Sequence, residues 1–331
     1  METLLLDPED VDENTEMRAV IVAVEEAFEA YEADRVEMPA KSYVDLPEYD
    51  GDFRSMPAYM DSGEWDAAGV KWVNVHTDNP VDHDLPTVMG TMIYSDPETG
   101  FPLALLDGTT LTRKRTGAAA AVATDHLAVA DATSLGIVGA GVQSYTQLEA
   151  ISAVRDIEEV IVADRREAAV EAFVETFGDA FDVRGGTIAE AASCDVLSTV
   201  TPVEEPIVSA EDVGEHTHVN AMGADAPGKN ELAPGVLTSG KLVIDDYEQC
   251  THSGEINVPW GEGILDDGDI YAELGEIVAG KRPGRTAEDG VTVFDSTGLA
   301  IQDVAAAHAV YERAKGRGNG TAFGLVDTRI R

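Results

Sequence analysis

The sequence predicts an α/β protein with two domains. Its 331 residues are about twice the ~150 residues of an average domain. Near residue 134 the pattern changes from short β-prone runs to apolar strands that alternate with helices. With 44% hydrophobic residues, the chain can bury a sizeable core, which argues against disorder.

The first part of the chain has an α+β pattern. Apolar residues recur at helical spacing over 17–31, which predicts an amphipathic helix. β-prone runs follow over 70–75, 87–94 and 103–106, separated by Pro and Gly. An Ala-rich helix over 116–127 then leads into the second pattern.

The second part has the pattern of a parallel sheet covered by helices. Apolar strands are expected over 135–138, 160–163, 196–200, 218–221 and 242–244, and helices over 143–154 and 167–177. A last helix, over 299–314, is expected to return to the first domain and make it discontinuous. The predicted domains are residues 1–116 with 306–331, and residues 117–305.

The charge of the chain is strongly negative, with 22 Lys and Arg against 63 Asp and Glu, or −41 in total. Such a surface repels phosphate backbones and anionic lipids, so neither a nucleic acid nor a membrane is expected as a partner. The acids are dispersed along the chain, which is typical of a halophilic protein: molar salt shortens the Debye length to ~3 Å and screens their repulsion.

The cell compartment is expected to be the cytoplasm. No stretch has the ~18 apolar residues of a spanning helix, and the first 13 residues lack the features of a signal peptide. Cys194 and Cys250 do not form a C-x-x-C pair, and the spacing of the histidines is not that of a ligand set, so no metal site is expected.

A glycine-rich turn predicts a dinucleotide site. Gly139 and Gly141 follow an apolar strand and precede a helix, so the backbone can approach a pyrophosphate at the helix N-terminus. Asp164 ends the next strand, where an acid accepts the ribose hydroxyls of NAD. Arg165 and Arg166 would instead suit the 2′-phosphate of NADP; NAD is favoured because Asp164 repels that phosphate.

Three further residues are candidates for substrate binding or proton transfer. Lys71 lies within an apolar β-like run, although the chain has only 7 lysines, and is suited to hold a carboxylate or to transfer protons. Arg115 belongs to a basic triplet at the expected start of the helix between the domains. Asp225 follows a strand of the nucleotide domain and is a candidate general base, although a turn-capping role explains it as well.

Six segments together resemble the ornithine cyclodeaminase and mu-crystallin family, which includes archaeal alanine dehydrogenases. They are Met56-Pro-Ala-Tyr59, Lys71-x-Val-Asn-x-His76, Arg115-Thr-Gly, Gly139-x-Gly-Val-Gln-Ser144, Asp225-x-Pro-Gly-Lys229-x-Glu-Leu232 and the segment from Asp295 to Val304. The resemblance implies a Rossmann domain that binds NAD(P), and a discontinuous α+β domain for substrate binding and dimerisation. It also implies a homodimer.

The resemblance also implies roles for single residues. Lys71 and Asp225 would be catalytic, and the substrate would be bound by Lys41, Arg54, Lys71, Arg115 and Lys229. Lys41 stands where many members have an arginine, and Arg54 would compensate for it. The cofactor would be bound by Thr87, Arg115, Gly139, Gly141, Val142, Gln143, Asp164, Arg165, Thr201, Val219, Ala221, Met222 and Ser296.

The expected activity is that of an NAD-dependent oxidoreductase acting at the Cα–amine of a small amino acid. Alanine dehydrogenase, which interconverts alanine with pyruvate and ammonia through an imine, is favoured. The segment Arg54-Ser-Met-Pro-Ala-Tyr59 resembles the archaeal alanine dehydrogenase branch of the family. Ornithine cyclodeaminase and cyclic ketimine reductase are the enzyme alternatives. A non-catalytic NAD(P)H-binding protein, like mu-crystallin, is the alternative from another class.

Overall fold

The computed structural model describes residues 2–327, which form two compact units. One unit consists of Met1–Arg115 and Leu299–Arg331, and the other of Thr116–Gly298. The predicted return into the first domain at residue 306 falls within a helix, whereas in the structure the chain returns at Leu299, just before that helix begins. Within the described residues, no helix has both the length and the apolar character needed to cross a bilayer.

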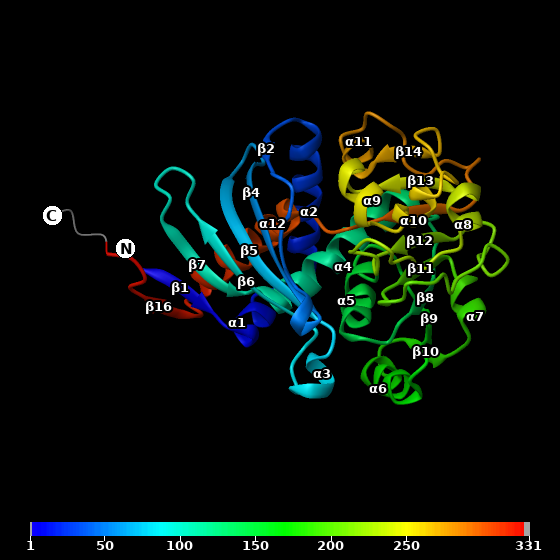
Figure 1. Cartoon of the computed structure of the whole chain (residues 1–331), viewed down its shortest axis with the longest axis horizontal. Helices are drawn as coiled ribbons and strands as arrows, with labels where there is room; N and C mark the ends of the chain where they lie inside the picture. The colour runs from blue at the N-terminus through cyan, green and yellow to red at the C-terminus, as the bar shows by residue number, and fades with distance from the viewer. Residues whose placement is uncertain (1, 328–331) are drawn as a thin grey trace. The chain divides into compact units, whose positions relative to one another are not determined.

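The first unit is a curved, mostly antiparallel sheet in the strand order β16-β1-β7-β6-β5-β4-β2, with β3 also paired to β4 (Figure 1). Its elements are β1 (Thr3–Leu6), α1 (Pro8–Glu13), α2 (Met17–Glu32), β2 (Val36–Glu37), β3 (Ser42–Leu46), a 3-10 turn (Pro47–Tyr49), β4 (Gly51–Asp61), β5 (Asp66–His76), α3 (Asn79–Asp82), β6 (Val88–Ser95), β7 (Pro102–Asp107), α12 (Ala300–Arg317) and β16 (Thr321–Phe323). The boundary between the units falls inside α4 (Gly108–Leu127).

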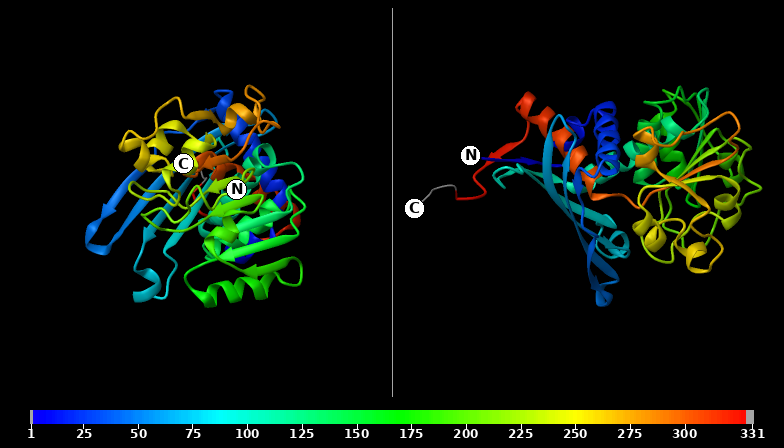
Figure 2. Two further views of the ribbon diagram at one scale, coloured as in Figure 1. Left: turned by 90° about the vertical axis from the view of Figure 1, so that its right-hand side faces the viewer. Right: turned by 90° about the horizontal axis from the view of Figure 1, so that it is seen from above.

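One face of this sheet is covered by helices. α12 packs on β4, β5 and β6, and α2 packs against α12 (Figure 2). Because side chains alternate along a strand, Met56, Lys71 and Met92 point to this covered face on three neighbouring strands and are buried. The core of the unit therefore lies between the sheet and α12.

The second unit is a parallel sheet in the order β10-β9-β8-β11-β12-β15-β13-β14. Its elements are β8 (Ser134–Val138), α5 (Val142–Ile151), β9 (Glu159–Ala163), α6 (Glu167–Phe177), β10 (Asp182–Gly185), α7 (Ile188–Ala192), β11 (Val196–Thr199), β12 (His218–Ala221), α8 (Pro234–Ser239), β13 (Lys241–Ile244), α9 (Tyr247–Ser253), α10 (Asn257–Gly261), β14 (Ile270–Glu273), α11 (Leu274–Val278) and β15 (Thr292–Asp295).

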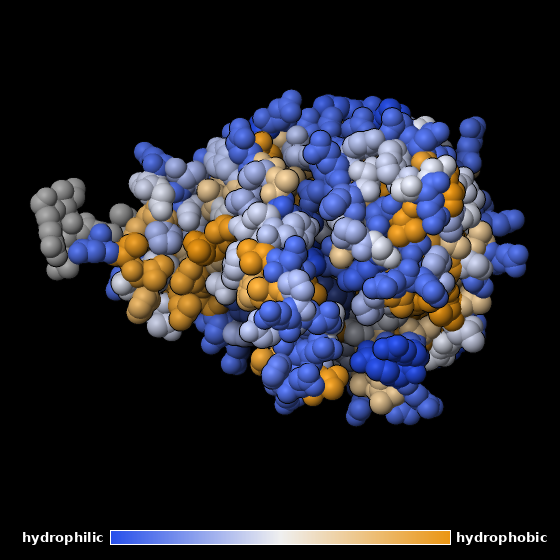
Figure 3. Space-filling view, in the orientation of Figure 1, coloured by the Kyte–Doolittle hydropathy of each residue, from blue (hydrophilic) through white to orange (hydrophobic). Residues whose placement is uncertain are grey.

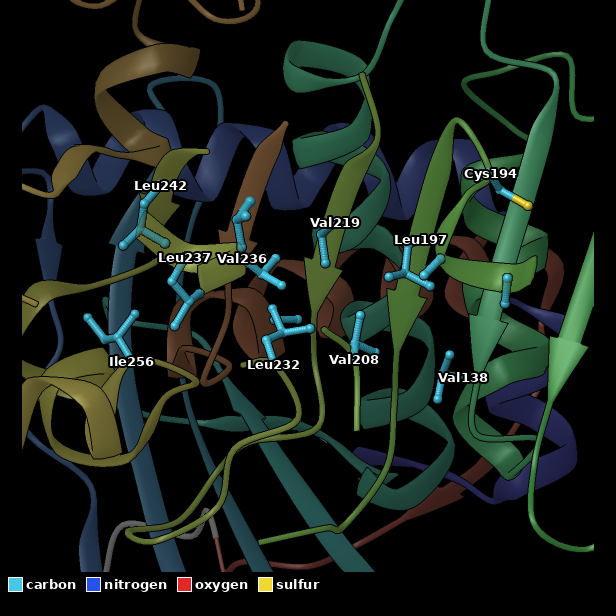
Figure 4. Packing of buried hydrophobic residues seen from close by; sticks show 14 of the residues in the cluster. Val138, Cys194, Leu197, Val208, Val219, Leu232, Val236, Leu237, Leu242 and Ile256 are labelled. Atoms are coloured by element: carbon cyan, nitrogen blue, oxygen red, sulfur yellow. The ribbon is translucent and has the colours of Figure 1, made fainter. Parts of the chain in front are cut away.

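Apolar residues are buried on both faces of this second sheet, as a parallel sheet requires. One cluster contains Val138, Leu197 and Val219 (Figure 4), and the opposite one contains Ile137 and Val196. The order from β10 to β12 is that of a doubly wound dinucleotide-binding fold, whose ligands bind beyond the carboxyl ends of the strands. The predicted α/β class, with a Rossmann domain and an α+β domain, is confirmed.

Candidate active site

The first unit buries an ion cluster between the sheet and α12. Lys71 on β5 donates from Nζ to Asp303 Oδ1 on α12, and its Nζ also lies 2.8 Å from Oδ2. Arg115 on α4 donates from Nε to the same Oδ1 at 3.1 Å. Lys71 is 1% exposed, Arg115 is 7% exposed and Asp303 is fully buried. The structure thus brings two predicted substrate residues to one carboxylate.

Two neutral side chains complete the surroundings of these cations. Lys71 Nζ also donates to Thr112 Oγ1 at 3.3 Å, and Arg115 Nη1 donates to Gln302 Oε1 at 3.1 Å. Burial lowers the pKa of Lys71 to about 7; Asp303 opposes this shift, whereas Arg115 and Lys41 add to it through like charge. Lys71 can therefore exchange a proton near neutral pH.

The other two predicted substrate cations belong to the same unit. Lys41 directly precedes β3 and is close enough to affect Lys71 electrostatically. Arg54 on β4 is buried, donates from Nε and Nη2 to the two oxygens of Asp52, and lies 5.5 Å from the centre of the Tyr43 ring. Ammonium and guanidinium groups are the side chains that bind a small carboxylate well.

The glycine turn of the second unit has the backbone that a dinucleotide needs. Gly139 follows β8 with a φ of 103°, and a Cβ there would lie 2.9 Å from Val200 O, so only glycine fits. At Gly141 a Cβ would meet no atom within 4 Å. Gly141 is the N-cap residue of α5, and among the described residues no side chain caps this helix, so its first amides can receive an anion. The residues present fit NAD.

Asp164 lies beside this turn. Its Oδ2 accepts from Ala140 N and its Oδ1 accepts from Arg166 N, both at 2.8 Å, and the Arg166 side chain also pairs with it. Burial opposes the ionised form, but the hydrogen bonds from Arg166 and Ala140 outweigh it and lower the pKa of Asp164. An ionised carboxylate at this point suits ribose hydroxyls. Arg165 is exposed next to it.

The remaining cofactor candidates of the second unit are at or near strand ends. Val142 is exposed at the start of α5, and the side-chain oxygen of Gln143 is buried with no hydrogen-bond partner among the described residues. Thr201 follows β11 and donates through N and Oγ1 to Glu231. Val219, Ala221, Met222 and Ser296 lie in β12 or directly after β12 and β15, and Ser296 N donates to Ala221 O at 3.2 Å.

Two candidate residues are placed differently from this group. Thr87 belongs to the first unit, where its carbonyl accepts from His76 N at 2.8 Å. Asp225 belongs to the segment after β12, and its Oδ1 lies 2.8 Å from Lys229 Nζ. The Asp225 side chain is 35% exposed, so water and solutes can reach it.

Several buried acids near the candidate site residues are not predicted from the sequence. Asp303 is the most important, and its signal is a Gln-Asp pair inside the apolar run from Leu299 to Ala307. In the second unit, Glu231 accepts from Thr201 and Gly223, Glu255 accepts from the amides of residues 231 and 232, and burial raises the pKa of both acids. They fix the loop that carries Asp225.

The family model of the ornithine cyclodeaminase/mu-crystallin family matches residues 1–318. The chain belongs to this family. It is 47% identical over 324 residues to the alanine dehydrogenase of Archaeoglobus fulgidus, covering 97% of this chain and 98% of the relative.

Solved structures agree with this placement. A structure described as an archaeal alanine dehydrogenase dimer with bound NAD superposes with a TM-score of 0.93 at 46% identity, covering 98% of this chain and 100% of that one. The Thermococcus litoralis Δ1-pyrroline-2-carboxylate reductase, in complex with NADH and L-proline, superposes with a TM-score of 0.92 at 36% identity, covering 96% and 99%.

Proposed function

We propose that this chain is an NAD-dependent alanine dehydrogenase. It would convert L-alanine, NAD and water to pyruvate, ammonia, NADH and a proton, and catalyse the reverse reaction. The near full-length similarity to the Archaeoglobus fulgidus alanine dehydrogenase carries this proposal. The buried cations of the first unit and the glycine turn of the second unit support it independently.

The first unit would bind the amino acid. Lys71 and Arg115, together with Arg54 and Lys41 of the same unit, would hold the α-carboxylate. This carboxylate is the one feature that alanine and pyruvate share with every alternative substrate. Holding one end of a small substrate fixes the direction of its Cα–H bond, and such positioning accounts for up to ~7–11 kcal/mol in favourable reactions.

The second unit would bind the cofactor, with the pyrophosphate on the first turn of α5 and the ribose at Asp164. Bound there, NAD supplies the acceptor for the Cα hydride. We assign Asp225 as the group that takes a proton from the attacking water, because its carboxylate is reachable from solvent. Lys229 Nζ lies 2.8 Å from Oδ1 of this carboxylate and would hold it in place.

Cyclic ketimine reduction is the second candidate, favoured by the likeness to the pyrroline-carboxylate reductase. Ornithine cyclisation is the third, because lysine cyclodeaminase superposes at a TM-score of 0.87. The substrates of these activities all carry a carboxylate and differ in the group at the far end. The cation cluster therefore does not distinguish them.

A substrate panel distinguishes the candidates. The protein in molar KCl is given alanine with NAD, pyruvate and ammonia with NADH, ornithine with NAD, and a cyclic imine with NADH, while NADH absorbance and products are followed separately. The proposal predicts a net NADH change with the first two pairs. Proline formed from ornithine without a net NADH change, or turnover of the cyclic imine alone, would contradict it.

We also propose that the chain forms a homodimer through the open face of the first sheet. Leu5, Leu105, Ile93, Val70 and Pro57 pair in sequence across five strands and form an apolar row there. Trp72, which is 45% exposed, stacks on Phe53 beside this row. Figure 3 shows apolar surface over the β16, β1 and β7 side of this sheet. Patches of this kind mark interaction sites.

The dimer is tested by charge substitution. Ile93→Glu places a carboxylate within the row and is expected to give a particle of one 35.1 kDa chain by sedimentation in molar KCl. Val22→Glu is the matched control, because Val22 is also an exposed β-branched apolar residue but lies on α2. A dimer that persists in Ile93→Glu, or that dissociates in Val22→Glu alone, would contradict this interface.

A further inference from the structure

Asp303 is a buried carboxylate with no role in the reaction as described so far. It is on α12, within a stretch whose neighbours Ile301, Val304 and Ala305 are fully buried. A charge in such a place is costly unless it is paired and hydrogen-bonded. Its partners are two groups from other elements, Lys71 on β5 and Arg115 on α4.

These contacts connect three elements at one point. Asp303 is 232 positions from Lys71 and 188 from Arg115 along the chain. Its neighbour Gln302 accepts from Arg115 Nη1, so the guanidinium is held at two of its nitrogens by adjacent residues of α12. Two hydrogen bonds from one helix fix both the position and the plane of a guanidinium group.

We propose that Asp303 is a positioning residue of the active site, whose carboxylate fixes Lys71 and Arg115 in one arrangement and favours the charged form of Lys71. This rests on the proposed function only in assuming that these two cations bind the substrate carboxylate. Asp303 acts through its two partners and is not itself a catalytic residue.

The groups around Lys71 explain why its proton depends on Asp303. From α12 it meets Asp303, from α4 Thr112 and Arg115, and from the segment before β3 it senses Lys41. Burial, Arg115 and Lys41 all lower the pKa of Lys71, and Asp303 is the one group of these that raises it. Without this carboxylate, the ammonium would be left with the neutral Thr112 and two like charges.

The direct test is a titration of Lys71 by NMR in protein carrying 13C,15N-lysine. The chain has only 7 lysines, and the signal missing in Lys71→Arg identifies Lys71. In Asp303→Asn the Lys71 midpoint is expected to fall by about 1 unit or more, the usual effect of losing an adjacent opposite charge. An unchanged midpoint in a folded Asp303→Asn protein would overturn the proposal.

Asp289→Asn is the matched control, because Asp289 pairs with Lys241 at 2.6 Å in the second unit. This substitution should shift the titration midpoint of Lys241 and leave the midpoint of Lys71 unchanged. A Lys71 shift as large as that in Asp303→Asn would mean that the loss of any paired acid has this effect, and would overturn the proposal. The titration needs no substrate, so its outcome does not depend on whether the chain is an alanine dehydrogenase.

A second variant tests positioning. Asp303→Glu keeps the charge but moves it by one methylene, so the Lys71 midpoint should stay close to that of the unsubstituted protein. Catalysis should nevertheless fall by about 100-fold in kcat/KM for alanine, the scale of a displacement of ~1 Å at a substrate-binding group. An unchanged kcat/KM in a folded Asp303→Glu protein would contradict the positioning role. This test remains decisive even if the Asp303→Asn protein does not fold.

Discussion

Lys71 is a buried residue that titrates in an unusual range. Burial lowers its pKa to about 7, so it is protonated below neutral pH and loses its charge as the pH rises. A carboxylate binds the protonated form. The affinity for pyruvate should therefore decrease by up to about tenfold per pH unit above pH 7.

Calorimetry with pyruvate in the presence of NADH and the absence of ammonia, from pH 6 to pH 9, measures this affinity without turnover. Lys71→Arg serves as the control, since a guanidinium keeps its charge throughout this range and should give a flat profile. A pyruvate affinity that is constant over the same range in the unsubstituted protein would show that Lys71 does not hold the carboxylate.

Local sequence patterns predict some residues of the candidate site, but they do not predict contacts between distant parts of the chain. Lys71 was noticeable as a rare cation in an apolar run, and the structure places it with Arg115 as part of one cluster. Asp303 was not predicted because its role depends on a contact over 232 positions, which no local pattern reveals. The pairing of Asp164 with Arg166 likewise required the backbone geometry after β9.

Within a single element, the turn from Gly139 to Gly141, the two glycines have different roles: Gly141 is expected to matter for NAD binding and Gly139 for stability. Gly141→Ala meets open space and should fold normally, yet its methyl group lies where a pyrophosphate would approach the backbone. We expect its Kd for NAD, measured by fluorescence titration, to rise at least about tenfold. Gly261→Ala, also in open space, should bind NAD normally.

Gly139→Ala should behave differently, because a side chain at a φ of 103° is strained and its Cβ would lie 2.9 Å from Val200 O. It should lose about 1–3 kcal/mol of unfolding free energy. Normal NAD affinity in Gly141→Ala would mean that the cofactor does not approach this turn.

Elements with strong periodicity were predicted well, and those with mixed signals were not. α6 matches its prediction over 167–177, and α2 extends one residue beyond its predicted end at residue 31. β4 was not predicted, because Pro57 argues against a strand; the structure accommodates it between the β2 and β3 pairings, where no ladder partner is needed on that side. α4 begins at Gly108 rather than at residue 116, because Asp107 accepts from Thr110 N and starts the helix early.

At the scale of the whole molecule, the excess of acids governs the response to salt. With a net charge of −41, carboxylates repel one another unless ions screen them. We expect the melting temperature, measured by calorimetry, to fall by about 10 °C or more between molar KCl and dilute buffer, the effect of losing a few kcal/mol. An unchanged melting temperature would contradict a salt-dependent fold.

The two-unit organisation was also largely visible in the sequence. The change of pattern near residue 134 reflects a real change from an antiparallel to a parallel sheet. The sequence predicts a returning helix over 299–314 with a domain boundary at residue 306, whereas the second compact unit ends at Gly298, before α12 begins. The packing of α12 on α2 and on β4, β5 and β6 assigns it to the first unit.

If the chain is an alanine dehydrogenase, hydride passes from the Cα of alanine to NAD. Incubation with NAD and alanine deuterated at Cα, in molar KCl, tests it most directly when the NADH formed is analysed by mass spectrometry. We expect one deuterium in each NADH and equal amounts of pyruvate, ammonia and NADH. NADH without deuterium, or no NADH from alanine while another amino acid is converted, would contradict it.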